Sequence, residues 1–428
     1  MSKIKHPSNW IECPLKDFII LKNGYAFDSN SYQEQGIPVV RISDITTEQQ
    51  VSLDNTVCVA DKPDYQNFII SKGDLLLAMS GATTGKLGIY SENTKIFQNQ
   101  RVGNLKIINT NICDSKFRNY LFFSLSNTIL KLAYGGAQPN ISGARLLSLS
   151  CVLPPLAEQK RIVKKIEELF GIIDKTVKYL NDTKQHLAQY RQSVLQQAFS
   201  GKLHKTTIWK QILLREAVDI NPKTTVPALA ETELVSFLPM SVVSEESLSY
   251  TEQKAPFGKV KKGYTKFQND DILFAKITPC MENGKGCIAQ NLSYGIGFGS
   301  TEFHVLRCSK EVFPKFIYYF VIQRHFRAAA KNKMSGAVGQ QRVPVEFLKE
   351  SPINLPSLPE QKAIVAKIET AFAAADKAEK AISAALEQAK QLKQSILKRA
   401  FEGKLVPQDP NDEPVDLSQL KTHKGKSK

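Results

Sequence analysis

The stretch Leu153-Pro154-Pro155-Leu156-Ala157-Glu158-Gln159-Lys160 returns later in the chain as Leu355-Pro356-Ser357-Leu358-Pro359-Glu360-Gln361-Lys362. The segments that follow stay in step, and both close on Ala-Phe-x-Gly-Lys-Leu, at residues 198–203 and 400–405. Each matched position is displaced by 202 residues without a gap, and 24 of 51 positions are identical. An ungapped match of this length indicates that the chain is a tandem duplication.

Each copy predicts one long helix. A proline-rich entry, a glutamate in the first turn and a glycine after the last apolar residue are typical start and stop signals. Apolar residues recur every seven positions over four to five heptads, a pattern typical of coiled-coil packing. The positions of this seam are Ile166, Ile173, Leu180, Leu187 and Val194 in the first copy, and Ile368, Ala375, Ile382, Ala389 and Ile396 in the second.

The two seams are complementary if the helices run antiparallel. Ile173 would then face Ala389, and Leu187 would face Ala375. Large residues opposite small ones are how packed helices interdigitate. Residues 157–199 as a helix would be about 60 Å long, at roughly 1.5 Å per residue. Two unrelated amphipathic helices, each on its own core, are the alternative, but they leave the ungapped identity unexplained.

Composition narrows the class of protein. Lys and Arg total 57 against 41 Asp and Glu, a net charge of +16, and the excess is spread over both globular and both helical segments. A spread excess favours a polyanionic partner such as nucleic acid, although a merely basic soluble protein fits the charge equally well. We expect no membrane segment and no signal peptide. The seven cysteines fit free thiols in a reducing cytosol, so we expect a cytoplasmic protein.

The sequence predicts five segments: globular domains at 1–152 and 206–354, helices at 153–205 and 355–405, and a tail at 406–428 whose last ten residues we expect to be disordered. The domains share a layout, with a turn and strand near 71–79 and 269–276, a helix over 114–132 and 313–330, and glycine loops at 134–141 and 335–342. The expected fold is α+β, with two mixed α/β domains separated by an antiparallel coiled coil and related by a pseudo-two-fold axis. The helices kept their sequence while the domains diverged, as expected for two different recognition domains held by one fixed pair of helices.

Motifs of catalysis and metal binding are missing. The nearest match to a nucleotide phosphate loop, Gly81-Ala82-Thr83-Thr84-Gly85-Lys86-Leu87, is one residue short and has Leu after Lys. Cys280, Cys287, His304 and Cys308 have a spacing unlike that of zinc fingers, which favours buried thiols and a structural histidine over a zinc site. We therefore expect neither a catalytic centre nor a metal.

Two matched loops are the main candidates for nucleic-acid contact. Each follows a buried strand and ends in Gly-Lys, at residues 80–86 and 278–285. Glycines let backbone N–H groups approach phosphates, lysine neutralises charge, and small polar side chains can read base edges. A tight hairpin with a solvated lysine is the alternative for each loop, as a solvated polar face is for the flanking candidates. The candidate DNA-binding residues are Ser80, Thr83, Thr84, Lys86, Gln100, Arg101, Lys261, Lys262, Tyr264, Lys276, Thr278, Asn283, Lys285 and Arg342.

The openings and closings of the two helices resemble those of the specificity subunits of type I DNA restriction–modification systems. The stretch 271–286 and Gly297-Phe298-Gly299-Ser300-Thr301-Glu302-Phe303-His304 look like one lineage of that family's target recognition domains. The resemblance covers almost the whole chain, and it is weakest over residues 1–152.

The resemblance implies that each recognition domain binds one half of a split, asymmetric double-stranded DNA target, and that the helix pair fixes the unread spacer. It also implies partners: two DNA adenine methyltransferase subunits carrying S-adenosylmethionine, and restriction/translocase subunits using ATP and Mg²⁺. The chain itself would hold no cofactor and would be non-catalytic. A free-standing sequence-specific DNA-binding regulator and a coiled-coil scaffold without a DNA role remain the alternatives.

Overall fold

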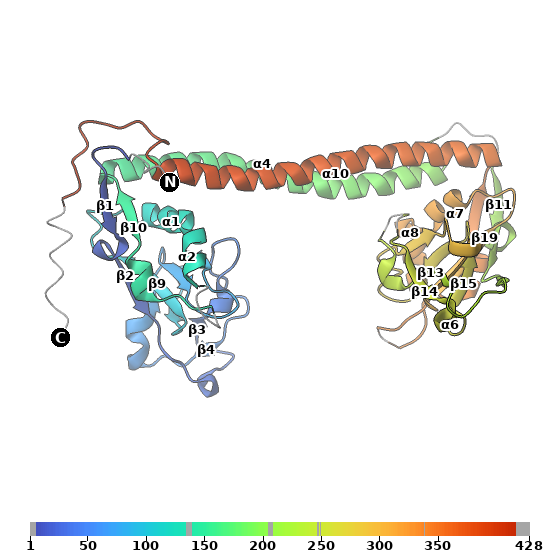
Figure 1. The fold of residues 1–428 in the computed structure, drawn as a ribbon, viewed down its shortest axis with the longest axis horizontal. Coiled ribbons are helices and arrows are strands. Elements are labelled where there is room, and N and C mark those ends of the chain that lie inside the picture. The colour runs from blue at the N-terminus through green and yellow to red at the C-terminus, as the bar shows by residue number, and fades with distance from the viewer. Residues whose placement is uncertain are drawn as a thin grey trace. The chain divides into compact units, whose positions relative to one another are not determined.

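The computed structural model describes residues 6–133, 139–203, 209–245, 248, 250–337 and 339–416. These residues form two compact units: Met1–Tyr179 with Ala385–Lys428, and Leu180–Ala384. Each unit holds one globular domain together with part of each long helix (Figure 1). The link at 204–208, most of the glycine loop at 134–141, Val338 in the other glycine loop, and the last residues of the tail lie outside the described residues.

The first globular domain is built on two four-stranded sheets and a ribbon. The ribbon pairs β1 (Ile11–Pro14) with β10 (Ser150–Leu153), antiparallel. One sheet has the order β2 (Ile19–Asn23), β9 (Val102–Ile107), β6 (Leu75–Ala78), β7 (Leu87–Ile89). The other has the order β4 (Cys58–Val59), β3 (Ile37–Val40), β8 (Ile96–Gln98), β5 (Ile69–Ile70), in which β3 and β8 are parallel.

The second globular domain repeats this topology strand for strand. The ribbon pairs β11 (Lys210–Leu213) with β20 (Pro352–Leu355). The sheets have the orders β12 (Val218–Ile220), β19 (Phe303–Cys308), β16 (Ile272–Ala275), β17 (Gly286–Ile288), and β14 (Gln253–Pro256), β13 (Leu234–Leu238), β18 (Ile296–Gly299), β15 (Thr265–Gln268). The parallel pair, β13 with β18, also recurs. The domains therefore diverged in sequence without changing their fold.

Each domain has two helices where the sequence predicted one, so that prediction was wrong in detail. The first domain has α1 (Ser115–Ser124) and α2 (Ser126–Ala133), and the second has α7 (Pro314–Val321) and α8 (Arg324–Asn332). Ser124 and Ser126 donate their hydroxyls to the carbonyls of Leu121 and Phe123, and such side-chain bonds compete with a continuing helix.

Short helices complete the domains. α3 (Gly143–Leu147) and α9 (Val345–Glu350) precede the last ribbon strand of each domain, and α5 (Leu214–Ala217) and α6 (Phe257–Val260) occur in the second. The 3₁₀ turns are η1 (Leu15–Asp17), η2 (Ser29–Ser31), η3 (Ile42–Asp44), η4 (Pro63–Phe68), η5 (Met240–Val242) and η6 (Ser293–Gly295).

The long helices are α4 (Leu156–Phe199) and α10 (Leu358–Phe401), each of 44 residues. In the second unit Lys184 pairs with Glu379 and Arg191 with Asp376. Residue numbers therefore rise along α4 as they fall along α10, which confirms the antiparallel arrangement of the two helices. None of the described helices is long and apolar enough to cross a membrane.

The apolar seam predicted from the heptads is buried or half-buried in the structure. Ile173 and Ala389 belong to the same apolar cluster of the first unit. Burial along the seam is uneven. The buried seam residues are Ile166, Ile173, Val194, Ile368, Ala375, Ile382 and Ile396, and the half-buried ones are Leu180, Leu187 and Ala389.

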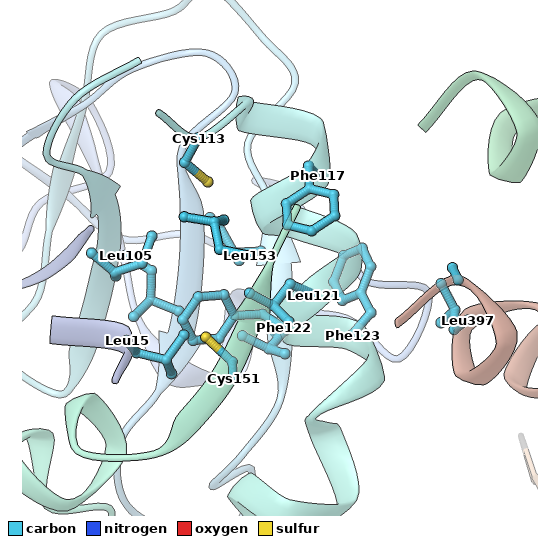
Figure 2. Packing of buried hydrophobic residues seen from close by; sticks show 14 of the residues in the cluster. Leu15, Leu105, Cys113, Phe117, Leu121, Phe122, Phe123, Cys151, Leu153 and Leu397 are labelled. Carbon is cyan, nitrogen blue, oxygen red and sulfur yellow. The ribbon is translucent and has the colours of Figure 1, made fainter. Parts of the chain in front are cut away.

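The helices complete the hydrophobic core of each globular domain. In the first unit Phe117 of α1 packs on Phe401 of α10, and Tyr120 packs on Phe170 of α4. Figure 2 shows Leu397 of α10 near the side chains of α1. The second unit has equivalent ring contacts, Phe199 with Phe316 and Tyr319 with Phe372. Each domain is therefore seated on both helices in the same way.

The repeated Glu-Gln-Lys motif holds each domain to its helix. The buried amide of Gln159 accepts from Asp114 N (2.8 Å) and donates to the carbonyls of Ile112 (2.7 Å) and Pro154 (2.9 Å). In the second unit Gln361 accepts from Phe313 N (2.8 Å) and donates to the carbonyls of Glu311 and Pro356. The role of this glutamine was not predicted from the sequence, although its identity in both copies was the signal.

The tail folds back on the first unit. Arg161 donates twice to Asp412, at 2.9 and 2.6 Å, and Gln408 donates to the buried Glu158, which also accepts from the Trp10 indole. Burial raises the pKa of Glu158. The part of the tail that the structure describes is thus a packed element of the first unit.

Candidate nucleic-acid interface

Three backbone segments meet at one end of the β2-β9-β6-β7 sheet. The chain leaving β6 donates from Met79 N to Arg101 O in the β8–β9 turn, at 2.9 Å. Ile141 N, just before α3, donates in turn to Met79 O at 2.8 Å. These bonds bring together the β6–β7 loop, the β8–β9 turn and residues 139–141, which are far apart in sequence.

We call the three segments joined by these backbone hydrogen bonds the frame of the domain. The second domain has the same frame. Lys276 N donates to Glu302 O at 2.9 Å, and Val343 N donates to Lys276 O at 2.8 Å. The matching turns are also alike, because Arg101 N donates to Asn99 Oδ1 and Glu302 N to Ser300 Oγ, both at 3.2 Å. The side chains of Arg101 and Glu302 therefore project from equivalent backbone positions in the two frames.

In the first domain the Gly-Lys loop is a hairpin turn between β6 and β7. Thr84 is buried, and its hydroxyl donates to the carbonyls of Gly81 (2.6 Å) and Pro139 (3.3 Å). Thr84 thus holds the loop together and is less available to DNA than the sequence suggested. Thr83 is half-buried and donates to Ile42 O, whereas Ser80 and Lys86 are half-buried at the frame. A strand, not a helix, follows the loop, so it is no nucleotide phosphate loop.

The equivalent loop between β16 and β17 is tied down by side chains. Lys285 is half-buried and donates to Met240 O at 3.4 Å, and Asn283 donates to Glu245 at 3.0 Å. The Thr278 hydroxyl is buried and has no hydrogen-bond partner among the described residues. Both Lys285 and Thr278 are thus less available to a ligand than the sequence suggested. Lys276 lies half-buried in the frame itself.

The flanking candidates lie on the frame in two cases out of three. Gln100 and Arg101 are exposed in the β8–β9 turn, and Arg342 is exposed in the segment before α9. Lys261, Lys262 and Tyr264 instead lie in the loop between α6 and β15, beside the other sheet of the second domain, where Lys261 pairs with Glu231 and Tyr264 packs edge-on against Phe237, with ring centroids 5.1 Å apart. No hydrogen bond or ion pair within the described ranges connects these three residues to the frame.

One ion pair crosses the frame of the second domain. Arg342 donates from Nε and Nη2 to the two carboxylate oxygens of Glu302, at 2.9 and 2.8 Å, and from Nη1 to Gln340 O at 3.1 Å. The hydrogen bond from Arg342 lowers the pKa of Glu302. The sequence did not reveal this pair, because the two residues are 40 positions apart.

The cysteine–histidine group does not form a metal centre. His304 uses both ring nitrogens, Nε2 with Val343 O at 2.8 Å and Nδ1 with the amide of Asn221 at 3.1 Å. Burial raises the pKa of the Cys287 thiol to about 12. No group of three metal-ligating side chains is found in the parts of the chain that the structure describes, and all seven cysteines are free.

Comparison with known proteins agrees with this architecture. The family model described as the type I restriction modification DNA specificity domain matches residues 7–182 and 209–388, once for each repeat. The chain belongs to this family. Among its relatives are the specificity subunit of the type I restriction enzyme EcoAI from Escherichia coli, 33% identical over 250 residues, and that of StySPI from Salmonella potsdam, 26% identical over 440 residues.

The matches differ in extent. The StySPI match covers 98% of this chain and 94% of the relative, whereas the EcoAI match covers 48% of this chain and only 42% of the relative. The HsdS subunit from Thermoanaerobacter tengcongensis shares the fold with a TM-score of 0.56 at 18% identity, covering 94% of this chain and 98% of that one. A chain from a study of assembly and conformational transition in the type I R-M system has a TM-score of 0.71 at 18% identity, covering 94% and 99%.

Proposed function

We propose that this chain is the DNA-specificity subunit of a type I restriction–modification system. Each globular domain would read one half of a bipartite, asymmetric target through the frame where its three loops meet. The observation that carries the proposal is that matching backbone frames carry different side chains in the two domains, such as Arg101 in the first domain and Glu302 in the second. Unlike side chains on like frames suit unlike half-sites.

The helices would supply the second part of the function. They join the two domains through repeated segments that share 24 of 51 positions, and half-sites read in the major groove need a spacing near one turn of DNA, about 34 Å. We place the docking of two DNA adenine methyltransferase subunits on this repeated surface, with restriction/translocase subunits joining the assembly. Repeated surfaces suit two copies of one partner, because each copy would meet a similar surface.

The chain itself would be non-catalytic and would act on DNA in the cytoplasm. S-adenosylmethionine, ATP and Mg²⁺ would be bound by the partner subunits. Support comes from the relatives, which are described as specificity subunits of restriction enzymes. The net charge of +16 suits a protein that holds a polyanion.

Selection from a randomised duplex library tests the proposal directly. The full chain, purified with its methyltransferase partner, should enrich two short motifs separated by a fixed unread spacer. A single continuous motif bound without any partner would favour a free-standing regulator. Absence of sequence-dependent binding in moderate salt would leave only a scaffold role.

A further inference from the structure

The frame of the second domain presents an arginine that is held in one orientation. We propose that Arg342, fixed by Glu302, reads a guanine in the half-site bound by the second domain. This inference rests on the proposed function and assigns a base class and two residues to it. It starts from the ion pair that crosses the frame between the β18–β19 turn and the segment before α9.

The guanidinium of Arg342 keeps two N–H donors that no described residue accepts. A guanidinium has five N–H donors in a planar fork. Three are used, by the two oxygens of Glu302 and by Gln340 O. The carboxylate occupies the Nε–Nη2 edge, so two donors remain, one on Nη1 and one on Nη2. Two parallel donors match the O6 and N7 acceptors of guanine in the major groove, which arginine commonly contacts.

Exposure is consistent with a ligand at this edge. The Arg342 side chain is 44% exposed and that of Glu302 is 23% exposed. An exposed ion pair contributes little to stability, on the order of 0–1 kcal/mol. What the pair does provide is orientation, because a carboxylate that binds the guanidinium with two bonds fixes its plane. Orientation of a recognition side chain before binding lowers the entropic cost of the contact.

The first domain supports the assignment by contrast. The backbone positions equivalent to Glu302 and Arg342 hold Arg101 and Asn140, and both are exposed. The two frames share matching backbone hydrogen bonds, so these two positions differ in side chain rather than in their place in the frame. Arg and Asn suit guanine and adenine respectively. We therefore infer that the two positions contribute to the difference between the half-sites.

Selection from randomised duplexes by the full chain in its complex tests the inference. Arg342→Lys keeps the charge but loses the fork, and it should lower the preference for one guanine of one half-site about tenfold while the other half-site is unchanged. Glu302→Gln frees the guanidinium and should also weaken that preference, but without lowering binding to unrelated DNA. Arg215→Lys is the matched control, since Arg215 pairs with Glu350 on the ribbon side of the same domain.

The outcomes separate this inference from the function on which it rests. A wild-type complex that enriches no two-part motif overturns the proposed function. A two-part motif that stays the same in Arg342→Lys and Glu302→Gln overturns only the role of this pair. An equal loss over all positions of both half-sites would assign Arg342 to the phosphate backbone and would also overturn guanine reading.

Discussion

Gln159 and Gln361 show how single buried side chains join the two parts of each unit. Each amide bridges the first turn of a long helix and the segment that opens α1 or α7. The amides are fully buried, so the backbone groups that they bond are shielded from bulk water. Identity between the two copies marked both residues, but a sequence alone does not say which backbone groups a glutamine meets.

Gln159→Ala should therefore be strongly destabilising. It leaves Asp114 N–H and two carbonyls without their partner, and each unsatisfied buried group costs about 1–3 kcal/mol. We expect a loss of about 3 kcal/mol in the unfolding free energy of the first unit, measured by urea denaturation. Lys160→Ala, at the exposed neighbouring position, is the control and should change stability by less than about 0.5 kcal/mol.

His304 should make the second unit sensitive to acid. Its pKa lies below the ordinary value of 6.5, mainly because burial disfavours the charged ring, with Lys276 nearby adding to the effect. Below pH 6.5 the unfolded chain binds a proton that the folded chain does not, so stability should fall as the pH falls below that value. Urea midpoints at pH 8 and pH 5 measure this. His304→Gln should flatten the fall, while His325→Gln, on an exposed residue, should leave it unchanged.

Lys86 and Lys285 should differ in their effect on DNA binding, although they occupy matching positions at the ends of the two Gly-Lys loops. Lys86 has no ion pair or side-chain hydrogen bond among the described residues, whereas Lys285 donates to Met240 O. Lys86→Ala should flatten the slope of log affinity against log salt by about one unit. Lys285→Ala should change it less. Equal slopes for wild type and Lys86→Ala would show that Lys86 contacts no phosphate.

At the scale of elements, the helices were the most predictable part of the molecule. Their heptads, proline entries and closing glycines are local signals, and the helix expected over residues 157–199 begins one residue earlier, at Leu156, and ends at Phe199. The loops were less predictable, because the roles of Thr84 and Lys285 depend on Pro139 and Met240, which lie 55 and 45 residues away. Long-range hydrogen bonds of this kind leave no pattern in a single sequence.

The seam should be energetically uneven. Ile166 is fully buried in the core that α4 shares with the first domain, whereas Leu180 is half-buried near the middle of the helix. Ile166→Ala should cost about 3 kcal/mol, since it deletes a large side chain from a packed core. Leu180→Ala should cost about 1 kcal/mol, because less apolar area is lost from a partly solvated site. Chemical denaturation of the two variants gives the comparison; equal losses would contradict it.

At the scale of the whole molecule, duplication explains both what the copies share and where they differ. Gln159, Phe170 and their counterparts contact a globular domain from the long helices. These contacts are needed in both copies, so the residues stayed the same. Reading different half-sites constrains only the frame, so its exposed residues were free to change. The strand order could not be predicted from sequence, since the two sheets of each domain are built from strands that alternate along the chain.

The central claim is that spacing and reading are separate properties of this chain, and one measurement tests it most directly. Four residues, about one helical turn or 6 Å, are inserted into residues 175–190 of α4, alone and with the same insertion at the equivalent place in α10. Adenine methylation is then mapped in cells that contain the variant and its methyltransferase partner. The account predicts both half-sites unchanged and a spacer longer by one or two base pairs, at about 3.4 Å each. Altered half-sites with the original spacer would contradict it.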